Sequence, residues 1–599
     1  MALLADTIKT YDLRQLKDLA AHLREDVFNA VRENGGHFAS NFGAVELTLA
    51  LYKTFSFPKD KLLFDVGHQS YTHKLLTGRT LELLRKKGGV SGFPDPAESE
   101  YDAFVAGHSG NAIAAALGLC AARDLRGENY KVVCFVGDAS LANGENLEAI
   151  FASEQKPKNL VVVLNDNGMA IDKSDSALYR SLSKATVRRC YRKFNAFLDK
   201  KFRTTSEFGR KLRRFKYSVK GWLNKNYFFE RCGFKYVGPV DGHDLEELVG
   251  VLNDVQKIED PVFLHAVTVK GKGYADAESD PVRFHGVGKN FAETDHSFSV
   301  ALGRLLCSRA QEDASLVAIT AAMTDGVGLS EFSQKFPDRF FDAGICEEAA
   351  VTMAAGMAKG GLSPVMCLYS TFLQRAFDQI VHDVCLQNLP VVFCIDRAGF
   401  VGADGKTHQG LLDVPILRAI PGLRLYAPKD CAELADVFDF ARSQGVPAAI
   451  RYPNGYAPNL GSKKKISEYY LWETLIEGDG VVVLACGARA VARAVEAKKL
   501  CGVPNVQIVN CRSVSPLDTR LLDNFANRKI ITFEEGYANG GFGSAVAEYY
   551  AQNNVSVRMK IIGAPSVFVP HATADEQAQS FKLTSVDLAR KIQAFDAQQ

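Results

Sequence analysis

The sequence has no pair of cysteines spaced as CxxC, although thirteen cysteines are scattered over its 599 residues. This scatter argues against zinc ribbons and a disulfide framework, and it indicates a reducing compartment. No apolar run approaches the roughly 18 residues needed to cross a bilayer. The first residues, MALLADTIKTYDLRQ, lack the basic-then-apolar pattern of a signal sequence. We therefore expect a cytoplasmic protein without a membrane partner.

The chain also has little net charge, only +2, which argues against a molecule built as a whole for binding nucleic acid. One segment is an exception, because residues 184–225 hold fifteen Lys or Arg against only Asp199 and Glu207. Aromatic residues are interleaved with these basic residues, so RNA binding is one reading of the segment. We favour a pair of amphipathic helices that form a flap over about residues 175–230, since no nucleic-acid module accompanies the run.

Polar residues follow two apolar stretches that read as parallel strands. VVCFV (132–136) leads into Asp138, and LVVVL (160–164) leads into Asn167. Because parallel strands joined by a helix end at the same edge of the sheet, these two side chains can meet. With the backbone carbonyl of Met169 they would form an all-oxygen site, which suits Mg²⁺ or Ca²⁺ but not zinc. The open positions of such a metal are usually filled by a diphosphate; the simpler reading is that Asp and Asn are turn formers.

Three histidines, His37, His68 and His108, precede this pattern and lie among glycines at predicted strand ends. Residues 100–122 are predicted to form a strand, a GHSG turn and an Ala-rich helix, with the turn offering backbone N–H groups to a phosphate. In an open α/β sheet, ligands bind at this edge. The alternative is that each histidine is a buried, hydrogen-bonded core residue.

Glu347 and Glu348 begin an Ala- and Met-rich segment that reads as a buried helix. Burial raises the pKa of a carboxyl unless a partner opposes it, so one of these acids is a candidate for proton exchange with a ligand. The ordinary alternative is an acid stabilised by the helix dipole.

The alternation of apolar strands with helices continues to the end of the chain and predicts an α/β fold. We expect three consecutive α/β domains with mainly parallel sheets, covering residues 1–296, 297–465 and 466–599. A stretch rich in turn formers and charge, residues 451–469, reads as the linker before the third domain.

Motifs that occur in one order over nearly the whole chain carry a family resemblance: GGHFAS, DVGHQSYTHK, GHS, the GD and NDN pair, VGPVDGHD, DAGICEE, YSTFLQRAFDQ, DRAGFVGADGKTHQG and RYP. Together they resemble the 1-deoxy-D-xylulose-5-phosphate synthase family of transketolase-like thiamine diphosphate enzymes. The resemblance implies a transketolase-like homodimer that uses thiamine diphosphate and Mg²⁺. It also implies condensation of pyruvate with D-glyceraldehyde 3-phosphate to 1-deoxy-D-xylulose 5-phosphate and CO₂, a step toward isoprenoid precursors, thiamine and pyridoxal.

The resemblance assigns roles to individual residues. The metal ligands would be Asp138, Asn167 and the Met169 carbonyl, and Glu347 would hydrogen-bond the aminopyrimidine ring. His37 and His408 would act in acid–base chemistry, supported by His285 and Asp404. The remaining cofactor contacts would be His68, Gly107, His108, Ser109, Ala139, Ser140, Asn167, Tyr274 and Phe372. The substrates would be held by Tyr369, Arg375, Arg397 and the position occupied by Asn454.

Several positions depart from the family pattern. Ala139 replaces a glycine, Gly110 the second serine of GHSS and Ala349 the histidine of Glu-Gln-His; Ala142–Asn143–Gly144 stands for Thr-Ala-Gly and Asn454 for the arginine of RYPRG. The cofactor site looks intact and the acceptor site altered. Two alternatives therefore stay open: a diverged paralogue with another aldehyde acceptor, and a cofactor-binding regulator that is not an enzyme.

Overall fold

The structure, a computed structural model, divides into two compact units, Met1–Glu293 and Thr294–Gln599. It describes residues 3–152, 156–168, 227–291, 297–455, 459–461 and 464–598. The basic segment 184–225 and Met169 lie outside these residues, so the predicted flap and the predicted carbonyl ligand stay predictions. Each unit is described by itself.

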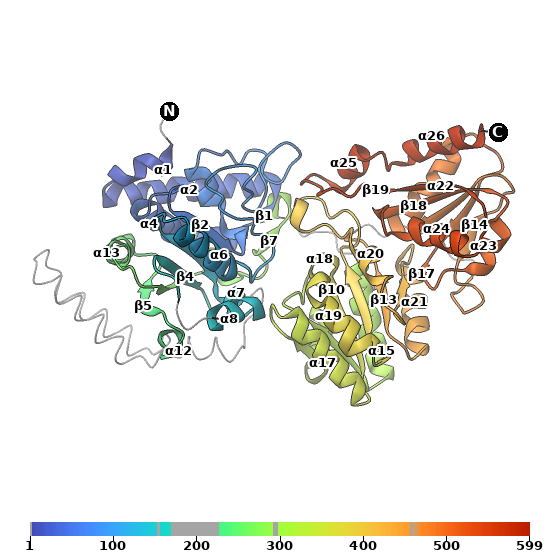
Figure 1. Cartoon of the computed structure of the whole chain (residues 1–599), viewed down its shortest axis with the longest axis horizontal. Helices are drawn as coiled ribbons and strands as arrows, with labels where there is room; N and C mark the ends of the chain where they lie inside the picture. Colours follow the sequence, from blue (N-terminus) through green and yellow to red (C-terminus); the bar gives the residue numbers. More distant parts are fainter. Residues whose placement is uncertain are drawn as a thin grey trace, which may run out of the picture. The chain divides into compact units, whose positions relative to one another are not determined.

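The first unit is built on a five-stranded parallel sheet (Figure 1). The strand order is β2 (Lys61–Asp65), β3 (Val132–Gly137), β4 (Leu160–Asp166), β6 (Val262–Val267) and β5 (Lys235–Asp241). Its central strands are almost continuously apolar because both faces are covered. One face packs on α2 (Leu13–Asn34), α4 (Val45–Thr54) and α13 (Leu245–Val255). The other face packs on α6 (Ala112–Leu125) and α8 (Gly144–Phe151).

Short elements complete the first unit. They are α1 (Leu4–Thr7), α3 (Ala39–Gly43), α5 (Tyr71–Leu76), α7 (Asp138–Leu141), α12 (Tyr227–Arg231), α14 (Ala275–Ser279) and the two-stranded antiparallel pair β1 (Gly36–His37) and β7 (Gly286–Val287).

The predicted strand within residues 100–106 is wrong, because these residues form turns that lead into α6. Side-chain bonds to a buried carboxylate fix this segment in place of a strand ladder. The carboxylate of Asp102 binds Nε2 of His73 at 2.6 Å and accepts two hydrogen bonds from Arg79, at 2.7 and 2.8 Å. Such a buried, fully paired carboxylate holds an irregular chain that residue patterns alone read as extended.

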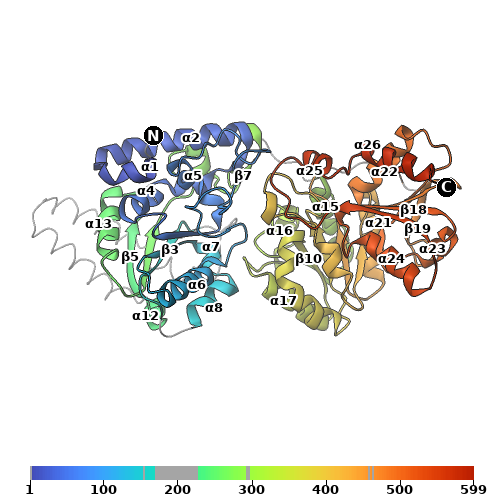
Figure 2. The same cartoon turned by 45° about the horizontal axis from the view of Figure 1, so that its top comes forward.

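The second unit contains a seven-stranded sheet whose strands are parallel except for β17 (Figure 2). The order is β17 (Ser513–Ser515), β12 (Arg424–Tyr426), β13 (Ala448–Arg451), β11 (Val392–Asp396), β10 (Ser363–Tyr369), β8 (Leu316–Thr320) and β9 (Phe340–Asp342). Helices that pack with it are α15 (Ser297–Glu312), α16 (Ser330–Lys335), α17 (Glu347–Lys359), α18 (Ser370–Leu373), α20 (Asp413–Leu417) and α21 (Cys431–Ser443). The short helix α19 (Phe377–Gln379) lies against α17.

A five-stranded sheet follows in the same unit, parallel except for β14. The order is β14 (Glu473–Ile476), β16 (Gln507–Asn510), β15 (Val482–Cys486), β18 (Lys529–Tyr537) and β19 (Arg558–Ala564). Its helices are α22 (Ala488–Leu500), α23 (Thr519–Phe525), α24 (Phe542–Gln552), α25 (Ala574–Ser580) and α26 (Ser585–Asp596).

A buried network of charges joins the two sheets of the second unit. Lys429 lies 3.1 Å from Glu433 and 3.2 Å from Glu473, and Arg512 lies 3.0 Å from Glu433. All four side chains are almost inaccessible to solvent. Because β17 also pairs with β12, the chain after residue 465 packs closely on the part before it.

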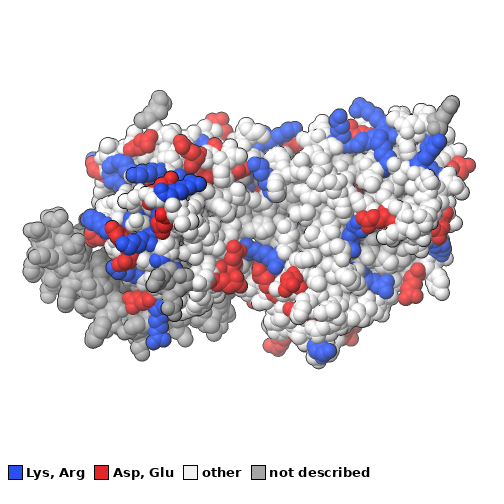
Figure 3. All heavy atoms as spheres, in the orientation of Figure 1, with Lys and Arg blue, Asp and Glu red and all other residues white. Residues whose placement is uncertain are grey.

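The predicted α/β fold class is confirmed. All three main sheets are mainly parallel, and helices alternate with their strands along the chain. The domain boundaries at 296 and 465 stay predictions. No helix in the described part of the chain is long and apolar enough to cross a membrane. On the face shown in Figure 3, basic and acidic side chains are interspersed over the first unit.

Candidate active site

At the carboxyl edge of the first sheet, the side chain of Asp138 contacts the backbone of Asn167. Oδ2 of Asp138 accepts hydrogen bonds from the backbone N–H groups of Asn167 at 3.1 Å and Gly168 at 2.9 Å. Its Oδ1 accepts one from the N–H of Ala139 at 2.8 Å. Burial, together with the nearby carboxylate of Asp166, raises the pKa of Asp138 to about 7. Two carboxylates crowded in this way create a negative potential that a bound cation would relieve.

This edge fits a hard divalent cation better than zinc. Among the described residues, no group of three His, Cys, Asp or Glu side chains could hold a metal. A metal here would therefore need amide or carbonyl oxygens beside a carboxylate, which is the kind of set that Mg²⁺ accepts when a diphosphate completes it. Asp138 and Asn167 stay the predicted side-chain ligands of such a metal.

The turn 107–110 is fixed by a buried carboxylate at the end of β2. Asp65 accepts hydrogen bonds from the N–H of Gly110 at 2.8 Å and from Nδ2 of Asn146 at 2.8 Å. Gly110 has a φ of 98°, and a Cβ built on it would lie 2.2 Å from Oδ1 of Asn143. The glycine and the asparagine, two of the departures from the family pattern, thus fit each other: a larger residue at 143 occupies the space left by a smaller one at 110.

Three of the predicted histidines form one cluster in the first unit. The ring centroids of His37 and His68 are 5.1 Å apart, those of His37 and His285 5.6 Å, and those of His68 and His285 5.1 Å. Burial, reinforced by the positive charge of Lys270, holds the pKa of His285 well below its usual value. His285 is therefore neutral at physiological pH and available as a hydrogen-bond donor or acceptor.

The other predicted cofactor contacts of the first unit lie on three further segments: the turn before α6, the helix α7 and the loop that carries Tyr274. His108 and Ser109 lie with Gly107 in the turn before α6, and Ser140 is buried in α7. The ring of Tyr274 packs on Phe28 at 5.7 Å and on Phe38 at 5.3 Å. Tyr274 belongs to an aromatic cluster beside a groove of about 540 Å³ along α2.

Sequence reasoning missed a partly buried ion cluster that holds the loop 269–274. Arg24 makes two hydrogen bonds to Glu46, at 2.7 and 2.6 Å, and a third to the carbonyl of Lys272 at 3.1 Å. Nε2 of His243 accepts the N–H of Val269 at 2.8 Å, so its Nδ1 carries the proton donated to Glu46 at 3.1 Å. The loop that carries Lys270 and Tyr274 is thereby tied to α2 and α4.

Replacing Glu46 by glutamine should destabilise the protein at neutral pH. Burial alone would raise the pKa of Glu46, but hydrogen bonds from His243 and Arg24 outweigh it and lower the pKa to about 2, from 4.5. A lowered pKa means stability that is present above pH 4.5 and lost as the pH falls toward 2, with an upper value of about 3 kcal/mol. Thermal unfolding from pH 7 to 3 should show the gap between wild type and Glu46→Gln closing with acidification. Glu25→Gln, an exposed acid next to Arg24, is the matched control; a gap that is constant with pH would contradict the assignment.

In the second unit, Glu347 is the first residue of α17 and only 2 % exposed. Burial raises its pKa to about 7, although the charge of Arg375 opposes the shift. Nη1 of Arg375 lies 3.8 Å from Oε2 of Glu347, too far for a hydrogen bond. Oε2 is buried and has no hydrogen-bond partner among the described residues. A carboxyl in this state is suited to a ligand nitrogen with which it can share a proton, as the aminopyrimidine of thiamine diphosphate would provide.

Aromatic and cationic side chains gather at the carboxyl ends of β10 and β11. The guanidinium of Arg397 lies 3.6 Å from the ring centroid of Tyr369 and donates a hydrogen bond to the carbonyl of Gly326 at 2.8 Å. Phe372 stacks on Tyr369 at 5.8 Å and meets the ring of His408 edge-on at 5.5 Å. Arg397 has a φ of 58°, a strained conformation that is common at functional sites.

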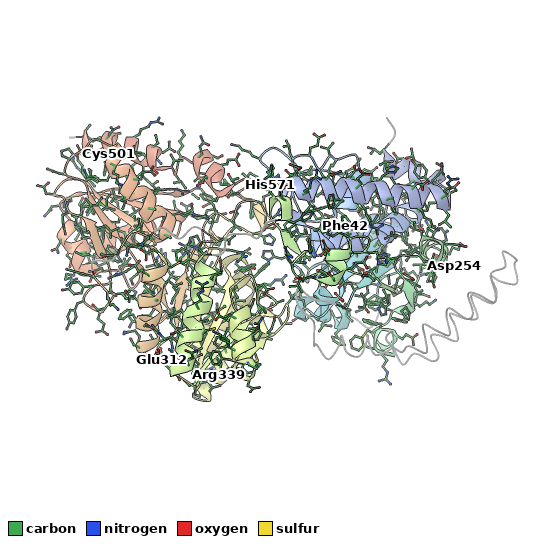
Figure 4. All side chains as sticks on the ribbon, turned by 180° about the vertical axis from the view of Figure 1, so that it is seen from behind. Phe42, Asp254, Glu312, Arg339, Cys501 and His571 are labelled. Carbon is green, nitrogen blue, oxygen red and sulfur yellow. The ribbon has the colours of Figure 1, made fainter. Side chains whose placement is uncertain are left out.

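Asp404 and His408 lie on the loop 397–410, which residues of the C-terminal part hold in place. Gln577 donates a hydrogen bond to the carbonyl of Gly402 at 3.1 Å. A Cβ at Gly405 would lie 2.9 Å from the backbone N of His571, the residue labelled in Figure 4. The third part of the chain therefore shapes the loop that carries two predicted catalytic residues.

Asn454 follows β13, and its backbone carbonyl accepts a hydrogen bond from Nη2 of Arg489 at 3.0 Å. Arg489 belongs to α22, in the C-terminal part, and sequence reasoning did not single it out. The position that departs from the family's RYPRG thus has a guanidinium beside it from another element.

Comparison with known proteins places the chain in a family. Residues 4–268 match the family model described as 1-deoxy-D-xylulose-5-phosphate synthase. Residues 295–458 match the pyrimidine-binding domain of transketolase, and residues 471–588 its C-terminal domain. The 1-deoxy-D-xylulose-5-phosphate synthase of Clostridium tetani is 43% identical over 98% of this chain and 97% of its own length. That of Syntrophomonas wolfei is 44% identical over 95% of this chain and 92% of its own.

The chain belongs to the 1-deoxy-D-xylulose-5-phosphate synthase family. It is therefore an enzyme, a transferase of a transketolase-like family that implies dependence on thiamine diphosphate. Among solved structures, the transketolase of Campylobacter jejuni aligns with 98% of this chain and 100% of its own at 16% identity, with a TM-score of 0.45. The roles of individual residues, and Mg²⁺ as the metal, stay predictions.

Proposed function

We propose that this member of the 1-deoxy-D-xylulose-5-phosphate synthase family condenses pyruvate with D-glyceraldehyde 3-phosphate, giving 1-deoxy-D-xylulose 5-phosphate and CO₂. Thiamine diphosphate and Mg²⁺ would be its cofactors, and a homodimer in the cytoplasm its working form. Isoprenoid precursors, thiamine and pyridoxal would be the products downstream. The observation that carries the proposal is Glu347, a buried carboxyl with a pKa of about 7 in a chain with full-length family relatives.

Residues of both units would have roles in this reaction. Asp138 and Asn167 would hold the metal and, through it, the diphosphate. When bound, thiamine diphosphate supplies the electron sink for decarboxylation. Glu347 would hold the proton that it shares with the pyrimidine ring, which its pKa near neutrality allows in either direction.

The substrates would meet cationic and basic side chains. Arg397, fixed on Tyr369 and on the carbonyl of Gly326, presents a preorganised charge to an anionic substrate. Neutral His285 would accept a hydrogen bond from a substrate hydroxyl, beside His37, and so support the acid–base chemistry. His408, against Phe372, would be the corresponding acid–base group of the second unit.

The direct test is to incubate the purified protein with thiamine diphosphate, Mg²⁺, pyruvate and a panel of aldehydes. Release of CO₂ together with a product of the mass of 1-deoxy-D-xylulose 5-phosphate supports the proposal. Release of CO₂ with a different aldehyde supports the diverged paralogue. Cofactor binding without any CO₂ from any aldehyde would support the regulator and overturn the proposal.

A second candidate, the same chemistry on another acceptor, is favoured by Asn454. Asparagine offers hydrogen bonds but no charge and no fork for a phosphate. If the acceptor is phosphorylated, Asn454→Arg adds a charge-assisted hydrogen bond worth about 1.5 kcal/mol, and the KM for D-glyceraldehyde 3-phosphate should fall roughly tenfold. The KM for pyruvate should stay nearly unchanged. If the natural acceptor carries no phosphate, the same substitution should impair its turnover, and steady-state kinetics with both acceptors separates the cases. No change with any aldehyde would mean that residue 454 does not face the acceptor.

A further inference from the structure

A narrow cleft in the second unit lies beside residues 451–454, where β13 ends next to the start of α22. Its walls include Arg451, Pro453, Cys486, Gly487, Arg489 and Glu535. The cleft has room for about 10 Å³, the space of one water molecule or one oxygen atom of a larger ligand.

The N-terminus of α22 opens into this cleft. The helix runs for 13 residues from Ala488, its N-cap is Gly487, and no side chain caps it. The first intrahelical bond runs from the N–H of Val491 to the carbonyl of Gly487. The N–H groups of residues 488–490 precede that bond and are the groups that an anion accepts at a helix N-terminus.

Arg451 provides a second and independent sign of a ligand. It is 5% exposed, and its Nε donates a hydrogen bond to Asp413 at 2.8 Å. Its Nη2 is buried and has no hydrogen-bond partner among the described residues. A Cβ built on Gly487 would lie 3.3 Å from Nη1 of Arg451, so this guanidinium faces the helix N-terminus. A buried donor without an acceptor is costly, and a ligand oxygen brought next to this guanidinium would remove that cost.

Arg489 brings a second guanidinium to the rim of the cleft. Its Nη2 donates to the carbonyl of Asn454 at 3.0 Å, and its Nη1 to the carbonyl of Phe400 at 2.8 Å and to Glu535 at 3.3 Å. Glu535 is shared, because Nη1 of Arg493 also binds it at 2.8 Å. The other acid that Arg493 contacts, Asp575, is exposed to solvent. Among the described buried groups, Arg451 has the carboxylates of Asp413 and Glu534 near it, and Arg489 and Arg493 share Glu535.

We propose that this cleft binds a phosphate group, with one oxygen between Arg451 and the N–H groups of α22 and another on Arg489. The group is either the phosphate of the acceptor aldehyde or free inorganic phosphate. The first source rests on the proposed function; the binding itself does not. With the acceptor as ligand, Arg489 supplies from α22 the positive charge that position 454 lacks.

The test compares Arg489→Met with Arg493→Met, two substitutions one turn apart on α22. Both arginines pair with Glu535, but only Arg489 lines the cleft. Calorimetric titration of the full chain with inorganic phosphate measures binding without turnover. We expect binding by the wild type, a roughly ten- to hundredfold loss in Arg489→Met and less than a threefold change in Arg493→Met. Arg489→Lys should recover part of the affinity, and thermal unfolding checks that each variant folds.

Kinetics then identify the source of the phosphate. A raised KM for D-glyceraldehyde 3-phosphate in Arg489→Met, with the KM for unphosphorylated D-glyceraldehyde unchanged, assigns the cleft to the acceptor. Loss of phosphate binding without a change in either KM assigns it to the free ion. Absence of phosphate binding by the wild type, or equal losses in Arg489→Met and Arg493→Met, would overturn the proposal. If the protein binds phosphate but releases no CO₂, the proposed function is refuted and the proposed phosphate site is still supported.

Discussion

Glu347→Gln is expected to abolish CO₂ release and, at the same time, to stabilise the protein in the absence of cofactor. Glutamine keeps the size of the side chain but cannot exchange a proton, so turnover should fall at least roughly a thousandfold, the upper range of a general acid–base contribution. Release of CO₂ from pyruvate, measured with saturating thiamine diphosphate and Mg²⁺, gives this readout.

The gain in stability follows from the sign of the pKa shift. The folded protein raises the pKa of Glu347 from 4.5 to about 7, so the folded state binds a proton more tightly than the unfolded state. The cost is absent below pH 4.5, grows as the pH rises to 7 and is constant above that, at about 3 kcal/mol. Thermal unfolding should therefore show Glu347→Gln above wild type at pH 8, with the difference shrinking toward pH 4.5.

Glu348→Gln is the matched control, because Glu348 is the next residue of the same helix end and is only partly buried. It should keep its activity and show a much smaller change in stability. Near-normal CO₂ release from Glu347→Gln would remove Glu347 from the reaction. If Glu347→Gln is less stable than the wild type at pH 8, the ionised carboxylate of Glu347 is stabilised by its partners rather than destabilised by burial.

The parts of the site that the sequence predicts are those set by the order of strands. Asp138 and Asn167 each follow an apolar strand, and neighbouring parallel strands bring their ends together whatever lies between. The burial of Glu347 was predictable from composition, since Ala and Met dominate the helix that it begins. Local patterns of this kind fix the sheet edges and the helix ends.

Contacts between side chains distant in the sequence could not be predicted from local patterns. The segment 100–106 reads as a strand, but the buried pairing of Asp102 with His73 and Arg79 holds it as turns. Arg24 reaches the carbonyl of Lys272 across 248 residues. The fit of Gly110 to Asn143 depends on how two loops pack. In each case a residue distant in the sequence fixes the local conformation, and no pattern within a few residues of the position predicts that contact.

Asp138→Ala is expected to remove the dependence of thiamine diphosphate binding on Mg²⁺. Asp138 is the only charged side chain among the predicted ligands, and removal of one partner from a buried charge contact costs about 3 kcal/mol or more. That cost corresponds to a loss of at least roughly a hundredfold in affinity. Calorimetric titration with thiamine diphosphate, with and without Mg²⁺, measures it.

The same carboxylate also accepts the N–H groups of Asn167 and Gly168, so the substitution loosens the loop whether or not a metal binds there. The dependence on Mg²⁺ separates the two effects, because loosening alone weakens binding equally with and without the metal. Asp166→Asn is the control: Asp166 accepts a hydrogen bond from the N–H of Gly168 at 3.2 Å and binds His265 at 2.7 Å, but it is not a predicted ligand. It should weaken cofactor binding without removing the Mg²⁺ dependence. If Asp138→Ala still binds thiamine diphosphate more tightly with Mg²⁺ than without, by the same factor as the wild type, the metal is held elsewhere.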